Sequence, residues 1–240
     1  MTSNKNAPSP KPMKKVVGKS APTVPAGDLD IYLLRVALDN LDPAIYRDVL
    51  VPKSATLEDL HRVAQAAFGW SDQHEHGFSQ NGTTLSGPAP EPEFWSPPHI
   101  EDLAELIAAE EQGFYPDAVS SGPQTAAPPE SKRRLDELLG KPKDKLNYVY
   151  DPGSNWEHTI TLMRLVPADP KTRYPLCVGG QFCSPPEGSG GVPGFLHAII
   201  NLMNPSARAA SEKILGKNFD HTRFELEDVN ARLHPRRAGI

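Results

Sequence analysis

The chain of 240 residues has a formal net charge of −5 and contains 26 prolines, about twice the usual share of about 5%. So much proline indicates that part of the chain lies outside a packed core, and we expect a single core domain. No run approaches the roughly 18 apolar residues of a membrane-spanning helix, and the N-terminus lacks the apolar stretch of a signal peptide. These features argue against a membrane protein and predict a cytoplasmic one.

The charge is unevenly distributed. The first 27 residues contain five lysines and no acid, so the remaining body is more acidic than the chain as a whole. An acidic body is a poor surface for nucleic acid, and no nucleic-acid partner is expected for it. Residues 1–28, rich in Pro, Ser and Lys, are predicted to form a disordered tail, and residues 236–240 a short basic tail.

The ordered part of the chain should begin with two strands and a helix. β-Branched and aromatic residues mark 31–38 and 45–51 as an antiparallel pair of strands. A helix is predicted at 57–68, where apolar residues recur at helical spacing between an N-cap at Thr56 and a stop at Gly69.

A short strand with two histidines should follow this helix. Alternation in "HEHGF" sends the side chains of His74, His76 and Phe78 to one face. His61, by contrast, lies between the core positions of the helix and is expected to be a surface or flanking residue.

The stretch of about 83–145 is less regular and rich in proline. Short helices are expected near 100–111 and at 132–139. We interpret the whole stretch as a variable insertion within a domain that spans residues 29–235.

Strand signals return at "KLNYVYD" and "WEHTITLMRL", which the turn over 151–155 would join as a hairpin. One face of the second strand should carry Trp156, His158, Ile160 and Leu162. Late helices are predicted in "PGFLHAIINLMN", with an apolar stripe of Leu196, Ile199, Ile200 and Met203, and in "FELEDVNARL". Strands and helices mixed without a βαβ rhythm favour the α+β class, with a single domain and a mainly antiparallel sheet flanked by helices.

Six segments of the sequence, in this order along the chain, resemble the plasmid Ri open-reading-frame-three-like family. They are "AIYRDVLVP", "TLEDLHRVAQAAFGW", "HEHGF", "YVYDPGSNWEHTI", "YPLCVGGQFCSPPEGSGGVPGF" and "FELEDVNARL". The resemblance covers roughly Asp30 to Leu233 and implies one α+β domain, an association with mobile genetic elements and no defined biochemical role. Some members are labelled resolvase-like, but this acidic body shows neither an arginine-supported nucleophilic serine nor a basic helix-turn-helix.

The chain departs from the family pattern at one corner. Members usually read Asp-Phe-Gly-Asp before the Trp and Pro-Pro-Glu-Asp before the Gly pair, whereas this chain has Pro152, Ser154 and Gly188. Two carboxylates are therefore missing, and a metal that depended on them would bind this chain more weakly or not at all.

Two interpretations of the polar residues stay open. The first is a non-catalytic interaction module without a cofactor, which recognises a protein, a peptide or a small polar ligand. Its candidate groove is lined by His74, His76, Asp151, Trp156, His158 and Glu187. The second is a metal- or thiol-dependent hydrolase in the same groove, because imidazole and thiolate favour zinc and an open zinc position activates water. Its candidate metal ligands are His74, His76, His158, Cys177 and Cys183.

A plainer structural interpretation exists for most of these residues. His158 could be a core histidine bonded to the backbone, and the two cysteines are expected to be free thiols. Asp151 could form an Asx turn, and Glu187 could accept backbone N–H groups of the glycine turn. The missing carboxylates favour the interaction module over the hydrolase.

Overall fold

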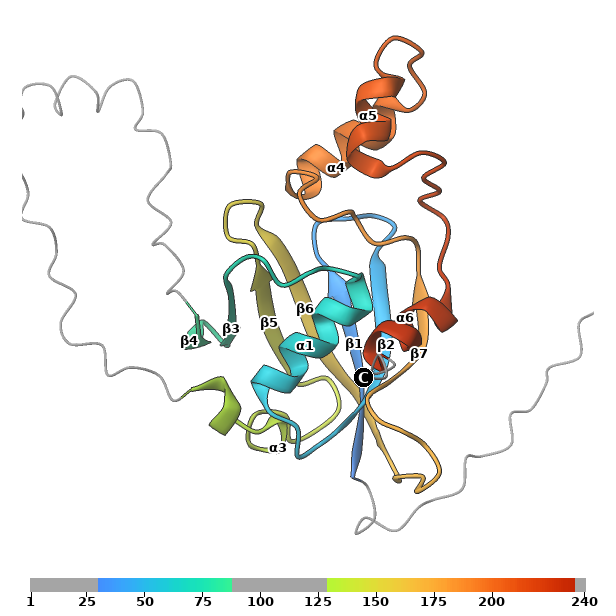
Figure 1. Ribbon diagram of the computed structural model, residues 1–240. Coiled ribbons are helices and arrows are strands. Elements are labelled where there is room, and N and C mark those ends of the chain that lie inside the picture. The colour runs from blue at the N-terminus through green and yellow to red at the C-terminus, as the bar shows by residue number, and fades with distance from the viewer. Residues whose placement is uncertain (1–29, 88–128, 236–240) are drawn as a thin grey trace, which may run out of the picture.

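The computed structural model describes residues 30–87 and 129–235, which form a seven-stranded antiparallel sheet in the order β4-β3-β5-β6-β1-β2-β7 (Figure 1). The strands are β1 (Ile31–Leu38), β2 (Ile45–Pro52), β3 (His76–Gln80), β4 (Thr83–Ser86), β5 (Lys145–Tyr150), β6 (Trp156–Val166) and β7 (Leu176–Gln181). The helices are α1 (Leu57–Phe68), α3 (Leu135–Leu138), α4 (Gly191–Asn201), α5 (Arg208–Leu215) and α6 (Leu226–Leu233), with a short 3-10 turn η1 (Glu130–Lys132). The predicted α+β domain is confirmed.

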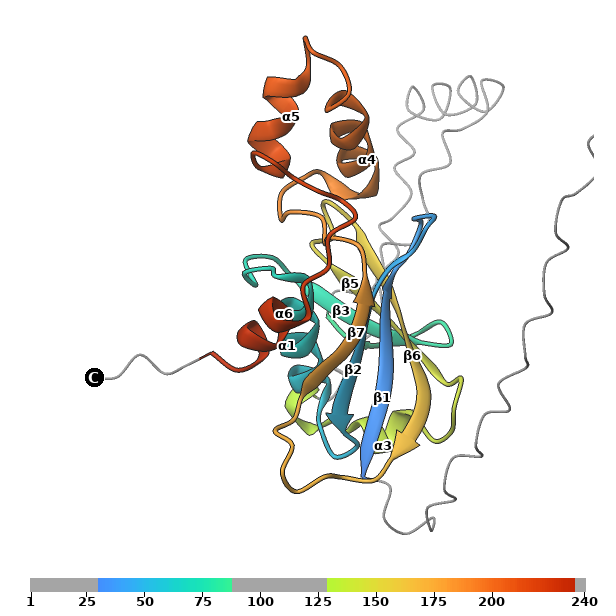
Figure 2. The same cartoon turned by 90° about the vertical axis from the view of Figure 1, so that its right-hand side faces the viewer.

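Two layers result from this order. Helices α1 and α6 cover one face of the sheet, and the pair α4 and α5 projects beyond the ends of the strands (Figure 2). None of the helices within 30–87 and 129–235 is long and apolar enough to cross a membrane.

The centre of the sheet follows from alternation in the sequence. In β1, Leu34, Val36 and Leu38 are buried under the helices. Alternate residues face the other way, where Arg35 and Asp48 form two hydrogen bonds of 2.8 Å across β1 and β2. Alternating apolar and polar side chains are typical of a sheet covered on one face, and both predicted strands are confirmed.

Helix α1 begins and ends where the sequence predicts. The Thr56 hydroxyl accepts a hydrogen bond from the N–H of Asp59, and the Asp59 carboxylate accepts one from the N–H of Thr56. This reciprocal pair is a capping box. Gly69 ends the helix with a φ of 77°, a left-handed conformation that suits glycine. The surface position expected for His61 is wrong, because only 4% of this residue is exposed.

The predicted hairpin is formed by β5 and β6. Asp151, at a φ of 51°, accepts a hydrogen bond from the N–H of Ser154 at 3.3 Å, so its side chain stabilises the turn three residues on rather than two residues on as in the predicted Asx turn. The side chains predicted for one face of β6 are all buried: Trp156, His158, Ile160 and Leu162.

Both ends of the stretch interpreted as an insertion belong to the sheet and its core. Residues 83–86 form β4, and Leu135 and Leu139 are fully buried. The helix expected at 132–139 is replaced by the two short pieces η1 and α3. The helix expected near 100–111 and the two predicted tails lie outside the described residues.

Arg47 of β2 has a buried guanidinium that binds backbone and hydroxyl oxygens. Only 2% of the residue is exposed, and burial lowers its pKa to about 10. Its acceptors are the carbonyls of Tyr46, Ala67, Gln181 and Phe182 and the hydroxyl of Ser184, at 2.7–3.3 Å. One side chain therefore joins β2, the end of α1 and the loop after β7.

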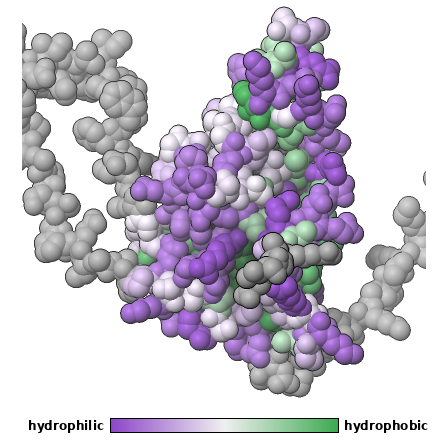
Figure 3. All heavy atoms as spheres, in the orientation of Figure 1, coloured by the Kyte–Doolittle hydropathy of each residue, from purple (hydrophilic) through white to green (hydrophobic). Residues whose placement is uncertain are grey.

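Of the apolar stripe predicted for α4, only Ile199 packs against the core. Phe195 and Ala198 are buried, whereas Leu196, Ile200 and Met203 are 41%, 69% and 88% exposed. The helix packs against α5 at the projecting end of the molecule, so only one of its faces is covered. Hydrophobic atoms are visible on this projecting pair at the top of Figure 3.

The exposure of Ile200 predicts a small effect of mutation. Ile200→Ser should change the free energy of unfolding by about 0.5 kcal/mol or less, as is usual for surface positions. Phe195→Ala on the same helix should cost about 3–5 kcal/mol, because it empties a buried site. Urea unfolding of both variants checks this contrast, and equal losses would show that the exposed stripe is covered in solution.

Candidate functional site

Two residues that were predicted to line the groove, Trp156 and His158, lie in the core instead. Trp156 is 0% exposed and His158 is 1% exposed. The Nδ1 atom of His158 lies 3.0 Å from the carbonyl oxygen of Trp156, and its ring packs edge-on against Phe68 and Trp70. Burial lowers the pKa of His158 to about 4. His158 is thus a neutral core histidine bonded to the backbone, as the plainer interpretation predicted.

Glu187 fixes the corner beside this core. Its carboxylate accepts hydrogen bonds from the N–H of Ser71 at 2.9 Å, from the Ser71 hydroxyl and from the Tyr150 hydroxyl. Burial raises the pKa of Glu187, but these hydrogen bonds outweigh burial and leave the pKa lowered. The acceptor role was predicted, but its donors are Ser71 and Tyr150 rather than the glycine turn.

The remaining predicted groove residues lie nearby but make few contacts with one another. His74 Nδ1 is 3.9 Å from the Asp151 carboxylate, and the His74 ring packs edge-on against Tyr150. His76 instead stacks on His61. The structure therefore brings His74, Asp151 and Glu187 together around Tyr150.

The residues proposed as metal ligands are spread across the sheet. Cys177 lies on β7 and His158 on β6, and two strands separate β6 from β7. Neighbouring strands are about 4.8 Å apart, so these two residues lie on strands about 14 Å apart. The thiols are free, as expected, and burial raises the pKa of both Cys177 and Cys183. A raised pKa keeps a thiol protonated and a poor nucleophile.

A polar cluster that the sequence did not reveal lies between α1 and β3. His61 Nδ1 is 2.9 Å from the Tyr148 hydroxyl, and His61 Nε2 is 2.9 Å from the Asp72 carboxylate. Gln65 donates to the same hydroxyl at 3.0 Å, and His76 Nε2 is 3.1 Å from Glu130. The helical position of His61, next to core residues, was the available signal, but its partners come from distant parts of the sequence.

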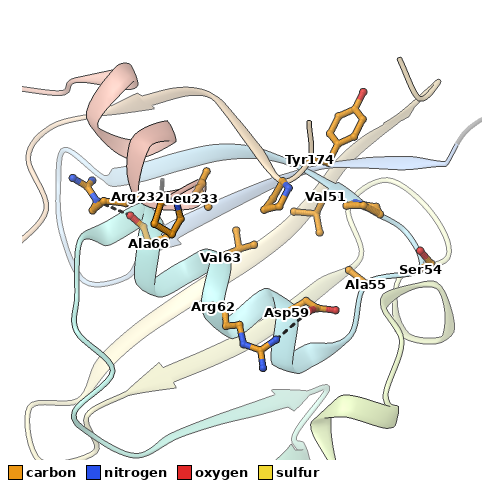
Figure 4. Close-up of a pocket in the computed structure, with 13 residues that line it drawn as sticks. Val51, Ser54, Ala55, Asp59, Arg62, Val63, Ala66, Tyr174, Arg232 and Leu233 are labelled. Carbon is orange, nitrogen blue, oxygen red and sulfur yellow. Dashed lines mark hydrogen bonds and ion pairs between the residues drawn. The ribbon is translucent and has the colours of Figure 1, made fainter. Parts of the chain in front are cut away.

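An open groove lies on the opposite side of α1, between this helix, the end of β2 and α6 (Figure 4). Its volume is about 570 Å³, within the range of ligand pockets. Apolar side chains make up much of its lining: Val51, Pro52, Ala55, Val63, Ala66, Pro175, Leu233 and Pro235.

Two arginines at the groove differ in how they are held. Arg62 forms ion pairs with Glu58 and Asp59. Arg232 donates from Nε to the carbonyl oxygen of Ala66 at 2.8 Å and makes no ion pair with a carboxylate among residues 30–87 and 129–235. The Arg232 side chain lies beside Ala66 at one end of the apolar groove (Figure 4), and its positive charge has no carboxylate partner within the described residues.

The fold and these sites define an α+β domain with one antiparallel sheet, a helix-lined groove and a separate histidine cluster. The model of the plasmid pRiA4b ORF-3-like protein family matches residues 30–228, and the chain belongs to this family. Uncharacterized protein y4hQ of Sinorhizobium fredii is 29% identical over 188 residues, which cover 77% of this chain and 79% of that protein.

A solved structure has the same fold. The crystal structure of the protein of unknown function MM3350 from Methanosarcina mazei Go1 aligns with a TM-score of 0.62 at 24% identity. The alignment covers 82% of this chain and 96% of that chain. The resemblance to the plasmid family predicted from the sequence is thus confirmed, and neither relative's name states an activity.

Proposed function

We propose that this domain is a non-catalytic interaction module that binds a segment of a partner protein in the groove between α1 and α6. The observation that carries the proposal is an open, largely apolar groove with the guanidinium of Arg232 at one end. We also propose that the protein acts in the cytoplasm, in association with mobile genetic elements, as the plasmid origin of the family name suggests.

The size of the groove suits a short peptide. Helix α1 rises about 1.5 Å per residue, so Asp59 to Ala66 spans about 10 Å, the length of about three extended residues. Apolar side chains of the partner would bury against Ala66 and Leu233, which are both partly exposed. A carboxylate next to them would pair with Arg232, because a guanidinium binds a carboxylate through two parallel hydrogen bonds.

The alternative, a metal- or thiol-dependent hydrolase, gains no support from the arrangement of the residues on which it was based. Such an enzyme needs the base, the nucleophile and any metal ligands in contact. Cys177 and His158 lie on strands about 14 Å apart, and His158 is closed off from solvent.

Selection from a phage-displayed random peptide library on the full-length protein tests the proposal. Enriched peptides should place Asp, Glu or the terminal carboxylate beside apolar residues. Arg232→Glu should raise their Kd at least about tenfold, which corresponds to about 1.4 kcal/mol, because like charges then meet. Ala66→Glu, which fills the groove from α1, should have the same effect.

The matched control is Arg164→Glu, which makes the same charge change at an exposed position of β6. Its Kd should stay at the wild-type value. Failure to enrich any peptide, or equal binding by wild type and Ala66→Glu, would contradict the proposal, and thermal unfolding of each variant verifies that it is folded.

A further inference from the structure

Two histidine rings lie face to face between two carboxylates on the side of α1 that faces away from the groove. The rings of His61 and His76 have centroids 3.5 Å apart and planes 6° from parallel. Nε2 of His61 is hydrogen-bonded to the Asp72 carboxylate, and Nε2 of His76 is hydrogen-bonded to the Glu130 carboxylate. One potential ligand atom from each of His61, Asp72 and His76 lies within 4.8 Å of the other two.

Hydrogen bonds join both rings of this cluster to neighbouring side chains. The Asp72 carboxylate can only accept, so Nε2 of His61 donates to it, and Nδ1 of His61 accepts from the Tyr148 hydroxyl, which also accepts a hydrogen bond from Gln65. Glu130 accepts from Nε2 of His76, because a carboxylate only accepts hydrogen bonds. Histidines that bind metals are commonly oriented in this way by a carboxylate or hydroxyl on their second nitrogen.

The charge of the cluster suits a cation. An Asp72 carboxylate oxygen lies 2.9 Å from Nε2 of His61, and a Glu130 carboxylate oxygen lies 3.1 Å from Nε2 of His76. Neutral imidazole and carboxylate are the forms in which these side chains bind a metal ion.

We propose that His61, Asp72 and His76 bind a divalent transition metal ion, with zinc as the best match, and that Glu130 orients His76. Two nitrogens and one carboxylate oxygen match the ligands of three-residue zinc sites, which keep a water at the fourth position. The Asp72 side chain is 57% exposed, so the ion and its water can reach the site from solvent.

One movement is required for this ion to bind. Parallel rings direct their lone pairs along parallel planes, so both nitrogens cannot point at one ion until a ring turns. The His76 side chain is 23% exposed and stands at the first residue of β3, whereas the His61 side chain is 5% exposed within a helix. His76 is therefore the ring that turns.

This inference is independent of the proposed peptide groove. Successive residues of a helix are about 100° apart, which places His61 about 200° from Asp59 on α1. The two sites thus lie on opposite faces of the helix, and variants of one leave the other intact.

Titration of the metal-free full-length protein with zinc sulfate in a calorimeter tests the proposal. The wild type should bind one zinc ion. Asp72→Asn and His76→Gln, each at a partly exposed position, should raise the Kd at least tenfold because each removes one of three ligands. His74→Gln is the matched control, two residues from His76 and outside the cluster, and its Kd should equal that of the wild type.

Three results would overturn the proposal. The wild type could fail to bind zinc, or Asp72→Asn and His76→Gln could bind as tightly as the wild type, which would place the ion elsewhere. His74→Gln could also weaken binding as much as His76→Gln does, which would place the ion outside the proposed ligand set. Circular dichroism of each variant verifies its fold.

Discussion

Replacing Arg47 with methionine is expected to lower the free energy of unfolding by about 3–5 kcal/mol. Methionine fills similar space but leaves the carbonyls and the hydroxyl that Arg47 binds without donors, and each unsatisfied buried acceptor costs about 1–3 kcal/mol. Arg47→Lys should recover only part of this loss, because an ammonium has three donors and the guanidinium has five. Urea unfolding measures both variants.

The matched control for Arg47 lies on the other face of the same pair of strands. Arg35 pairs with Asp48 through two hydrogen bonds, but its side chain is 37% exposed. Arg35→Met should therefore cost about 0–1 kcal/mol, the usual value of a surface ion pair. Equal losses for Arg35→Met and Arg47→Met would contradict the structural role assigned to Arg47.

The second large effect is a loss of stability in acid that depends on His158. Its folded pKa of about 4 lies below the unfolded value of about 6.5. In the unfolded chain the ring takes up a proton as the pH falls below about 6.5, while in the folded protein it stays neutral down to about pH 4. The contribution of the neutral His158 ring to the free energy of unfolding is therefore fully present above about pH 6.5. It falls by about 3 kcal/mol as the pH drops from about 6.5 to 4.

A variant separates this contribution from that of other groups. His158→Leu removes the titrating ring and keeps an apolar side chain of similar size. When the pH falls from 7.5 to 4, the free energy of unfolding of the wild type should drop by about 3 kcal/mol more than that of the variant. A difference that stays constant over this range would show that the buried ring is not what makes the protein acid-sensitive.

Patterns among neighbouring residues correctly predicted the strands and the helix whose formation depends on those neighbours. Alternation located β1 and β2, and the capping residue Thr56 located the start of α1, because these signals depend on neighbours in the sequence. The stripe on α4 was misplaced because periodicity shows that a helix has an apolar face but not whether another element covers it. The projecting position of α4 was not readable from its own sequence.

The candidate site was predicted in part for a similar reason. The sequence analysis placed His74, Asp151 and Glu187 in one groove, and these three residues do lie close together in the structure. His158 was also assigned to the groove, although a buried strand face and a groove wall give the same alternation. The cluster around His61 depends on partners from α1, β3, β5 and η1, and no spacing within one segment reveals such a set.

The interaction module would be tested most directly by hydrogen exchange of the full-length protein with and without a saturating selected peptide. The account predicts that exchange slows at the C-terminal half of α1, at α6 and around Tyr174, the elements that line the groove. It also predicts unchanged exchange in the projecting pair α4 and α5. Protection that appears on α4 and α5, and not along α1 and α6, would contradict the central claim.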